Sequence, residues 1–207
     1  MINAHSIATR KCIEAALVTV IQEKGFKALT VADLLRQAKV SRGTFYRYYL
    51  DKYDLLDQCE DQLMTAMQEI FDQYPKPNLM RIEETSPVNA FYVMMKVIYQ
   101  HRRAISTLVN CPETTLLAKI KRLIGDKLIV TPSSELMSTK PTSLVSAELA
   151  KALIVENIVT ILTYWLGQAP MVAPTSAYEI FLRSRLLSPV DLAGIMMASA
   201  SIKQTKA

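Results

Sequence analysis

Apolar side chains recur every third or fourth residue along most of this chain, which is the period of one face of an α-helix. No stretch alternates apolar and polar residues and no hairpin turn motif occurs, so the pattern predicts an all-α protein. A polar, proline-bearing segment at 75–87 and a segment rich in Ser, Thr and Pro at 131–142 interrupt it, and we expect loops there. The predicted helices are 9–24, 30–38, 41–49, 52–74, 91–98, 103–109, 114–129, 143–168 and 175–187.

The stretch 30–56, TVADLLRQAKVSRGTFYRYYLDKYDLL, places two short helices close together. Thr30 and Ser41 are favourable N-caps, and Val40 and Phe45 occupy the two positions of a hydrophobic staple. Helix, short turn and helix is the helix-turn-helix arrangement, in which the second helix reads DNA. On composition alone, an amphipathic surface helix rich in Tyr and Arg is an equally good interpretation.

The same stretch resembles the N-terminal DNA-binding domain of the tetracycline-repressor (TetR) family. Lys39 departs from the family pattern because it stands where Gly is frequent, and it must then adopt a positive φ. Tyr48 departs because it stands where His is frequent. The motifs that carry the resemblance are Ala-x-Val-Ser at 38–41, Thr-x-Tyr at 44–46, an aromatic pair at 48–49 and Lys-x-x-Leu at 52–55.

The resemblance also implies which residues contact operator DNA. Arg42, Gly43 and Arg47 are expected nearest the base edges, because the outer side of the second helix enters the major groove. Lys52 is expected to contact a phosphate. The full set of predicted DNA-contacting residues is Thr30, Ser41, Arg42, Gly43, Thr44, Tyr46, Arg47, Tyr48 and Lys52.

The distribution of charge supports a division of the chain at residue 54. Residues 1–54 carry nine Lys or Arg and five Asp or Glu, whereas the remainder carries fifteen and fourteen. The basic excess therefore lies where neutralisation of phosphates would use it. We expect an N-terminal three-helix head with the helix-turn-helix over 1–54, and a larger helical domain for dimerisation and ligand binding over 55–207.

The segment 152–166 is apolar almost all round, so a helix here needs cover on two sides. One side would meet the protein's own core and the other a second copy. This segment and Asn110-Cys111 also resemble the C-terminal domain of Firmicutes-type TetR members. The predicted dimer interface consists of Ile154, Ile158, Ile161, Leu162, Trp165 and Ile180.

Methionine and aromatic side chains of the middle helices are candidates for an adaptable pocket that takes an apolar or aromatic effector. Filling of an ordinary core is the more common role of each of them. The predicted pocket residues are Met67, Ile70, Phe71, Phe91, Met94 and Met95.

Other chemistry has little support in the sequence. The three cysteines show neither metal-ligand spacing nor even pairing, which is typical of a reducing compartment. His5 and His101 have no recognisable catalytic partners, and the five glycines form no phosphate-binding loop. We expect no enzymatic activity, no cofactor and no metal. We also expect a cytoplasmic protein with no secretory signal and no membrane span.

Together these features predict a homodimeric regulator that binds double-stranded operator DNA and represses transcription until a small-molecule effector releases it. The alternative is a co-activator or interaction protein on the same scaffold, which responds to no free ligand.

Overall fold

The computed structural model describes residues 4–76, 88–127, 146–184 and 186–204, and every regular element in these ranges is an α-helix. The prediction of an all-α protein is confirmed. The loop predicted at 131–142, and most of the one at 75–87, lie outside the described residues. The helices are α1 (Ala4–Ala28), α2 (Val31–Ala38), α3 (Arg42–Tyr46), α4 (Lys52–Gln73), α5 (Ala90–Gln100), α6 (Arg102–Val109), α7 (Leu116–Lys127), α8 (Ala147–Leu166), α9 (Pro174–Ser184) and α10 (Pro189–Gln204).

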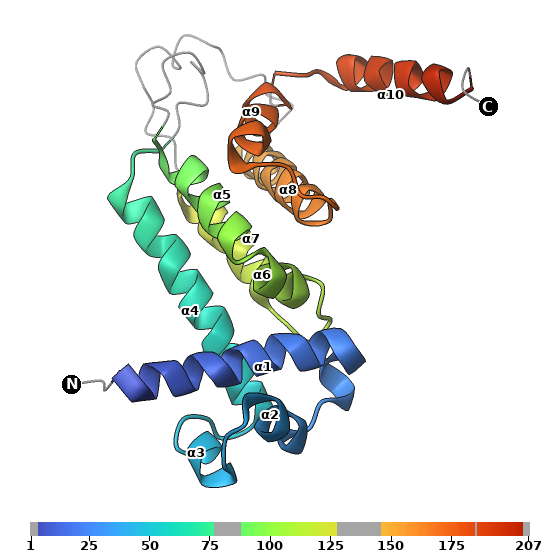
Figure 1. The fold of residues 1–207 in the computed structure, drawn as a ribbon. Coiled ribbons are helices and arrows are strands. Elements are labelled where there is room, and N and C mark those ends of the chain that lie inside the picture. The colour runs from blue at the N-terminus through green and yellow to red at the C-terminus, as the bar shows by residue number, and fades with distance from the viewer. Residues whose placement is uncertain (1–3, 77–87, 128–145, 185, 205–207) are drawn as a thin grey trace.

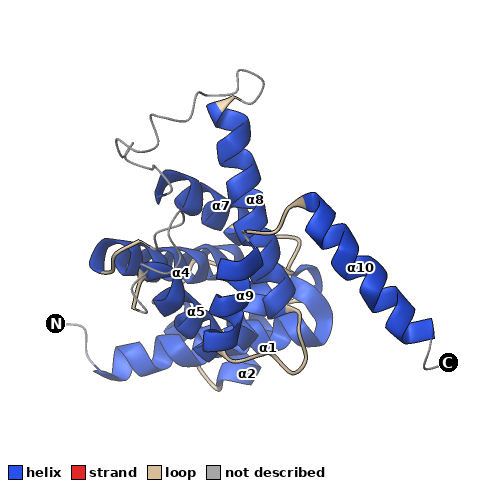
Figure 2. Ribbon diagram, turned by 90° about the horizontal axis from the view of Figure 1, so that it is seen from above, coloured by secondary structure: helices blue, strands red, loops and turns tan. Residues whose placement is uncertain are grey.

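The first three helices form a head at one end of the molecule, and α1 lies across the base of α4 (Figure 1). From the head, α4 runs into the body, where α5 and α7 lie beside it. Helices α8 and α9 complete the side of the body opposite α4. Helix α10 projects from the end of the body farthest from the head, and the view from above shows it standing clear of the other helices (Figure 2).

Two residues with positive φ shape the head. Gly25 has a φ of 75° and interrupts α1 near the position where the sequence predicts the end of the first helix. Lys39 has a φ of 55°, as the departure from glycine in this turn predicts, and its N–H donates to the Leu35 carbonyl. A non-glycine residue in this region is strained, so the turn between α2 and α3 is a local weak point of the head.

Aromatic rings hold α5 between α4 and α9. Phe91 meets Phe71 edge-on, with 5.6 Å between ring centroids, and stacks on Phe181 at 5.1 Å. Asn89 is fully buried, caps α5 and donates to the Tyr178 hydroxyl at 2.5 Å. These contacts fill the centre of the body with well-matched surfaces rather than open space.

One side of α8 is buried in the protein's own core, and this corrects half of the predicted dimer interface. Ile158, Leu162 and Trp165 are at most 5% exposed, so they have no surface to offer a second copy. The other two predicted residues on α8 are half-buried, and Ile180 on α9 is exposed. A helix that is apolar on all sides does not reveal from its sequence which side its neighbours will cover.

The opposite side of α8 carries no charge along its whole length. Its residues follow one another at spacings of three or four, which places them on one face of the helix, and all of them are exposed. We call this surface the outward face of α8. It consists of Leu149, Leu153, Asn157, Thr160 and Tyr164.

By length and composition, α8 is the one helix among the described residues that could cross a membrane. The core helix of a soluble protein passes the same test, and one side of α8 packs against the body. Its composition is therefore weak evidence for a membrane span.

Helix α10 is missing from the sequence-based prediction, which ends the last helix at 187. A Pro and an Asp inside an apolar run look like interruptions, yet here they start a helix. Ser188 accepts the Asp191 N–H at 3.2 Å, and its own N–H donates to the Asp191 carboxylate at 2.8 Å, which completes a capping box. Pro189 occupies the first helical position, where its missing N–H costs nothing. The signal was present in the sequence.

Candidate DNA-binding interface

Two aromatic side chains anchor the recognition helix α3. Phe45 and Tyr49 are both buried, and their ring centroids lie 5.6 Å apart. The Tyr49 hydroxyl donates to the Glu14 carboxylate at 3.3 Å, and the Arg10 guanidinium lies 5.9 Å from the Tyr49 ring centroid. Burial raises the pKa of Tyr49 to about 12, so its hydroxyl keeps its proton at neutral pH. Phe45 and Tyr49 therefore face the interior of the head.

Ser41 fixes the start of α3. Its Oγ accepts the Thr44 N–H at 3.1 Å and lies 2.8 Å from the Thr44 Oγ1. A hydrogen bond between two hydroxyl groups uses only one of their two protons. The other proton stays available to an acceptor such as a phosphate oxygen.

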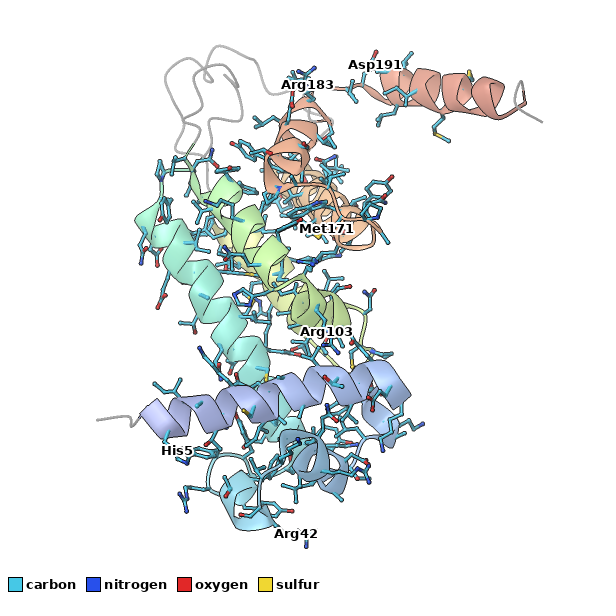
Figure 3. The ribbon with its side chains drawn as sticks, viewed as in Figure 1. His5, Arg42, Arg103, Met171, Arg183 and Asp191 are labelled. Carbon is cyan, nitrogen blue, oxygen red and sulfur yellow. The ribbon has the colours of Figure 1, made fainter. Side chains whose placement is uncertain are left out.

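The outer side of α3 presents cations to solvent. Arg42, Tyr46 and Arg47 are exposed and Tyr48 is half-exposed, and Figure 3 shows Arg42 at the end of the head that points away from the body. Lys39, in the preceding turn, is a third exposed cation, which the predicted set omits. None of the three cations forms an ion pair with any residue that the structure describes. Cations arranged in this way are free to neutralise phosphates or to donate to guanine.

Gly43 lies among these side chains, and the fold itself does not require a glycine there. A Cβ built at Gly43 would meet only the Ser41 Oγ, at 4.0 Å. The missing side chain therefore leaves room on the outer surface, where the backbone of α3 can approach another molecule closely.

Thr30 is exposed, but its donors are already engaged. Its N–H and hydroxyl donate to the Asp33 carboxylate at 2.9 and 2.6 Å, and its Oγ1 accepts the Asp33 N–H. Lys24 and Arg36 also pair with this carboxylate. These donors, Lys24 first, hold the pKa of Asp33 well below its usual range. A phosphate accepts and does not donate, so the predicted DNA contact of Thr30 is corrected to a role in capping α2.

Lys52 also lies differently from the prediction. Its ammonium donates to the carbonyl oxygens of Phe26, Lys27 and Leu29 at 3.0, 3.2 and 2.8 Å. These three bonds use all of its protons, at a helix C-terminus where a cation is favourable. The structure therefore gives Lys52 the role of joining α4 to the end of α1, and its predicted phosphate contact is corrected.

A buried carboxylate fixes α4 to the body. Glu60 is 1% exposed, and its oxygens accept the N–H and the hydroxyl of Thr115 at 2.8 and 2.7 Å. The Lys119 ammonium lies 3.0 Å from the same carboxylate. The sequence-based prediction misses Glu60, although its spacing from Leu56 and Leu63 places a charge on the apolar stripe of α4. Such a charge is a signal of a buried polar contact.

A second link joins α1 to α6. Gln22 donates to the Thr107 hydroxyl at 2.7 Å and accepts from the Arg103 guanidinium at 3.0 Å. Arg103 also donates to the Thr19 hydroxyl at 3.3 Å, and Figure 3 shows it at the junction of head and body. The head is thus attached to the body through both α1 and α4.

The predicted ligand pocket is largely filled. Met67 and Met94 line a small apolar cavity of about 20 Å³ among α4, α5, α6, α7 and α8. A cavity of this size holds about one water molecule, so an effector must displace side chains to enter it. The other four predicted residues are packed in the core away from this lining, and their assignment is corrected: they are Ile70, Phe71, Phe91 and Met95.

The structure also describes the surroundings of the thiols and acidic side chains. Burial raises the pKa of Cys59 to about 12 and also raises that of Cys111, so both thiols are protonated and poor nucleophiles at neutral pH. Cys12 is exposed. No group of three or more His, Cys, Asp or Glu side chains in the described part of the chain could hold a metal ion.

Comparisons with known proteins agree with the geometry of the head. The family model of the bacterial regulatory proteins of the tetR family matches residues 13–59, which run from α1 through α3 into α4. The uncharacterised HTH-type transcriptional regulator YxbF of Bacillus subtilis (strain 168) is 23% identical over 99 residues, which are 47% of this chain. The aligned part is 26% of YxbF, so the chain spans about a quarter of that relative's length.

Solved structures match most of the chain. NalD of Pseudomonas aeruginosa, the secondary repressor of the MexAB-OprM multidrug efflux pump, matches with a TM-score of 0.58 at 16% identity over 89% of this chain and 96% of NalD. FadR of Bacillus subtilis, solved in complex with stearoyl-CoA, matches with a TM-score of 0.54 at 18% identity over 84% of this chain and 96% of FadR. At these identities the likeness shows a shared fold. The family match over residues 13–59 shows that the head is a domain of the tetR family of bacterial regulatory proteins.

Proposed function

We propose that this protein is a DNA-binding transcriptional repressor that a small apolar effector releases from its operator. The observation that carries the proposal is the orientation of α3, in which Phe45 and Tyr49 are buried while Arg42, Gly43 and Arg47 face solvent. A helix held from one side, with its cations unpaired on the other, fits the major groove of DNA. A protein that acts on operator DNA works in the cytoplasm, where we place it.

A homodimer would supply the second reading helix. Two-headed regulators bind half-sites about 34–36 Å apart, one turn of DNA, so the subunits must hold the heads at that separation. We propose that the outward face of α8, with Leu153 and Tyr164, and the exposed Ile180 of α9 form the seam. The Firmicutes-type assignment of this domain stays a prediction.

Release would follow from the links between body and head. Helices α6 and α7 both line the apolar cavity, and both hold the head: α6 through Arg103 and Gln22, and α7 through Lys119 and Glu60. A ligand that enlarges the cavity must shift one of these helices, and the shift reaches α1 or α4. Tenfold weaker operator binding requires about 1.4 kcal/mol of preference for the DNA-free arrangement.

The chemistry of the cavity favours an apolar effector. Its lining consists of apolar side chains apart from Thr163. FadR, which shares the fold, was solved with stearoyl-CoA, so long acyl chains belong among the first compounds to be tested. Flexible methionines at Met67 and Met94 allow such a cavity to expand.

Fluorescence anisotropy with a duplex from the region upstream of the gene tests the DNA-binding step. We expect the duplex to bind more tightly than a scrambled sequence, and Arg42→Ala to lose roughly 1–3 kcal/mol of that preference. Arg183→Ala, which removes an exposed arginine of α9, is the control and should leave binding unchanged. Equal affinity for both duplexes would reject the proposal. Binding that requires a second protein would instead support the co-activator alternative.

A further inference from the structure

Helix α10 carries apolar side chains that its own body does not cover. Val190 is 79% exposed, Met196 is 73% exposed and Leu192 is 47% exposed, while Leu186 in the preceding link is 70% exposed. Figures 1 and 2 show the helix directed away from α8 and α9. A single helix of 16 residues is only marginally stable in water, and its stability normally comes from packing of its apolar side.

The start of α10 is well defined. The capping box of Ser188 and Asp191 closes its first turn, four residues after the end of α9 at Ser184. Figure 3 shows Asp191 at the start of α10 and Arg183 at the end of α9. Ser188 donates its N–H and its hydroxyl to the Asp191 carboxylate, and these bonds fix the first turn of the helix.

A second copy of the chain offers a surface of the same chemistry. The outward face of α8 is uncharged and exposes Leu149, Leu153 and Tyr164, and Ile180 of α9 is exposed as well. A stable dimer buries about 800 Å² from each partner, contributed by about 20–30 residues a side. Four large apolar side chains supply only part of the apolar centre of such an interface.

We propose that α10 is an exchanged arm that docks on the outward face of α8 in a second copy of this chain. The exchange rests on the proposed homodimer. A two-fold axis makes each copy give one arm and receive one, so the contact forms twice. Leu192 and Met196 lie four residues apart on one side of α10, and with Leu186 in the preceding link they add three large apolar side chains to each half of the interface. The arm thus supplies surface that α8 and α9 lack.

Disulfide trapping in the full-length chain tests the exchange. The background carries Cys12→Ser, since Cys12 is the exposed thiol. Met196→Cys is combined with Leu153→Cys or with Tyr164→Cys, two positions on the outward face, and the protein is oxidised in air. We expect a covalent dimer on a non-reducing gel from at least one pair. Met196→Cys with Thr65→Cys, an exposed position on α4, is the matched control and should remain uncrosslinked.

The outcomes distinguish a failure of the proposed arm exchange from a failure of the proposed homodimer. A covalent dimer from Met196→Cys alone would mean that the arms pair with each other, and a disulfide within one chain would mean that the arm folds onto its own body. Either result overturns the exchange, as does the absence of any link in a chain that sediments as a dimer. A monomer in sedimentation would reject the proposed homodimer itself.

A second variant measures the strength of the contact. Met196→Asp should raise the dimer dissociation constant at least tenfold, because a charge would enter an apolar contact. Leu50→Asp, at an exposed apolar residue of the head, is the control and should leave dimerisation unchanged. An unchanged constant for Met196→Asp would overturn the exchange.

Discussion

The Glu60 carboxylate accepts the Thr115 N–H at 2.8 Å, and it thereby joins the helix that leaves the head to the start of α7. The carboxylate is buried and fully partnered, since Thr115 also donates its hydroxyl and Lys119 lies beside it. The contact is a buried polar link between α4 and the start of α7, a helix that lines the cavity.

Glu60→Gln should lower the free energy of unfolding by roughly 1–3 kcal/mol. The variant removes the negative charge beside Lys119, and its amide has one oxygen in place of the two that accept the N–H and the hydroxyl of Thr115. Urea denaturation measures the change. Asp61→Asn is the matched control, since Asp61 is exposed and pairs with the same lysine at 2.8 Å; it should cost under about 1 kcal/mol. Equal losses in the two variants would show that burial adds nothing to this contact.

Lys52→Ala should destabilise the head and leave the salt dependence of DNA binding unchanged. The loss in free energy of unfolding should be roughly 1.5–3 kcal/mol, because a charged donor to three carbonyl groups is removed. Arg47→Ala should do the reverse: it should reduce the salt slope by about one unit with little effect on stability. A reduced slope in Lys52→Ala at unchanged stability would restore the phosphate contact that the sequence predicts.

The contacts of Lys52 and Lys119 show which features of the structure a local sequence pattern can predict and which it cannot. The caps at Thr30 and Ser41 and the positive φ of Lys39 depend on neighbours within four residues, so they could be predicted. Lys52 bonds to carbonyl groups more than twenty residues earlier, and no local pattern reports such a partner. A family pattern states which residue stands at a position, whereas the folded chain decides whether its donors are already in use.

The same reasoning applies to the body. Periodicity predicts that α8 is a helix, but the side that is buried depends on α7 and α9, which pack against it from elsewhere in the chain. The pocket residues were predicted by type, whereas in the structure Phe91 stacks on Phe181 and meets Phe71 edge-on. Packing between helices that are distant in the sequence therefore explains why both the predicted dimer interface and the predicted pocket had to be corrected.

Gly43→Ala should separate folding from DNA binding. The added methyl group meets only the Ser41 Oγ, at 4.0 Å, and alanine is a better helix former than glycine by roughly 0.5–1 kcal/mol, so stability should be unchanged or slightly higher. Operator affinity should nevertheless fall about tenfold or more, because the methyl group stands where the duplex approaches. Thermal unfolding and anisotropy measure the two effects. Unaltered affinity would show that DNA does not approach the backbone at Gly43.

Asp33→Asn should make the stability of the head less dependent on pH. Hydrogen bonds from Lys24 and Thr30 lower the pKa of Asp33, so its stabilising effect is complete above the ordinary aspartate pKa of about 3.9 and is lost as the pH falls further. The variant should therefore be less stable than the parent at pH 7, and the difference should narrow below about pH 4. Asp57→Asn, at an exposed residue, controls for net charge. A difference that is constant between pH 7 and pH 3 would contradict the role of the carboxylate.

Met94 provides the sharpest test of the release mechanism, because it lines the cavity while its neighbour Met95 is equally buried but lies outside the lining. Met94→Ala and Met95→Ala should each cost roughly 2–5 kcal/mol of stability. Only Met94→Ala should join its new space to the existing cavity, so it should bind benzene or a similar small apolar compound, which thermal shift detects. Met94→Trp should instead fill the cavity, push α6 or α7 and lower operator affinity without unfolding the head. If Met94→Trp is folded and binds the operator with parental affinity, the effector acts elsewhere in the body.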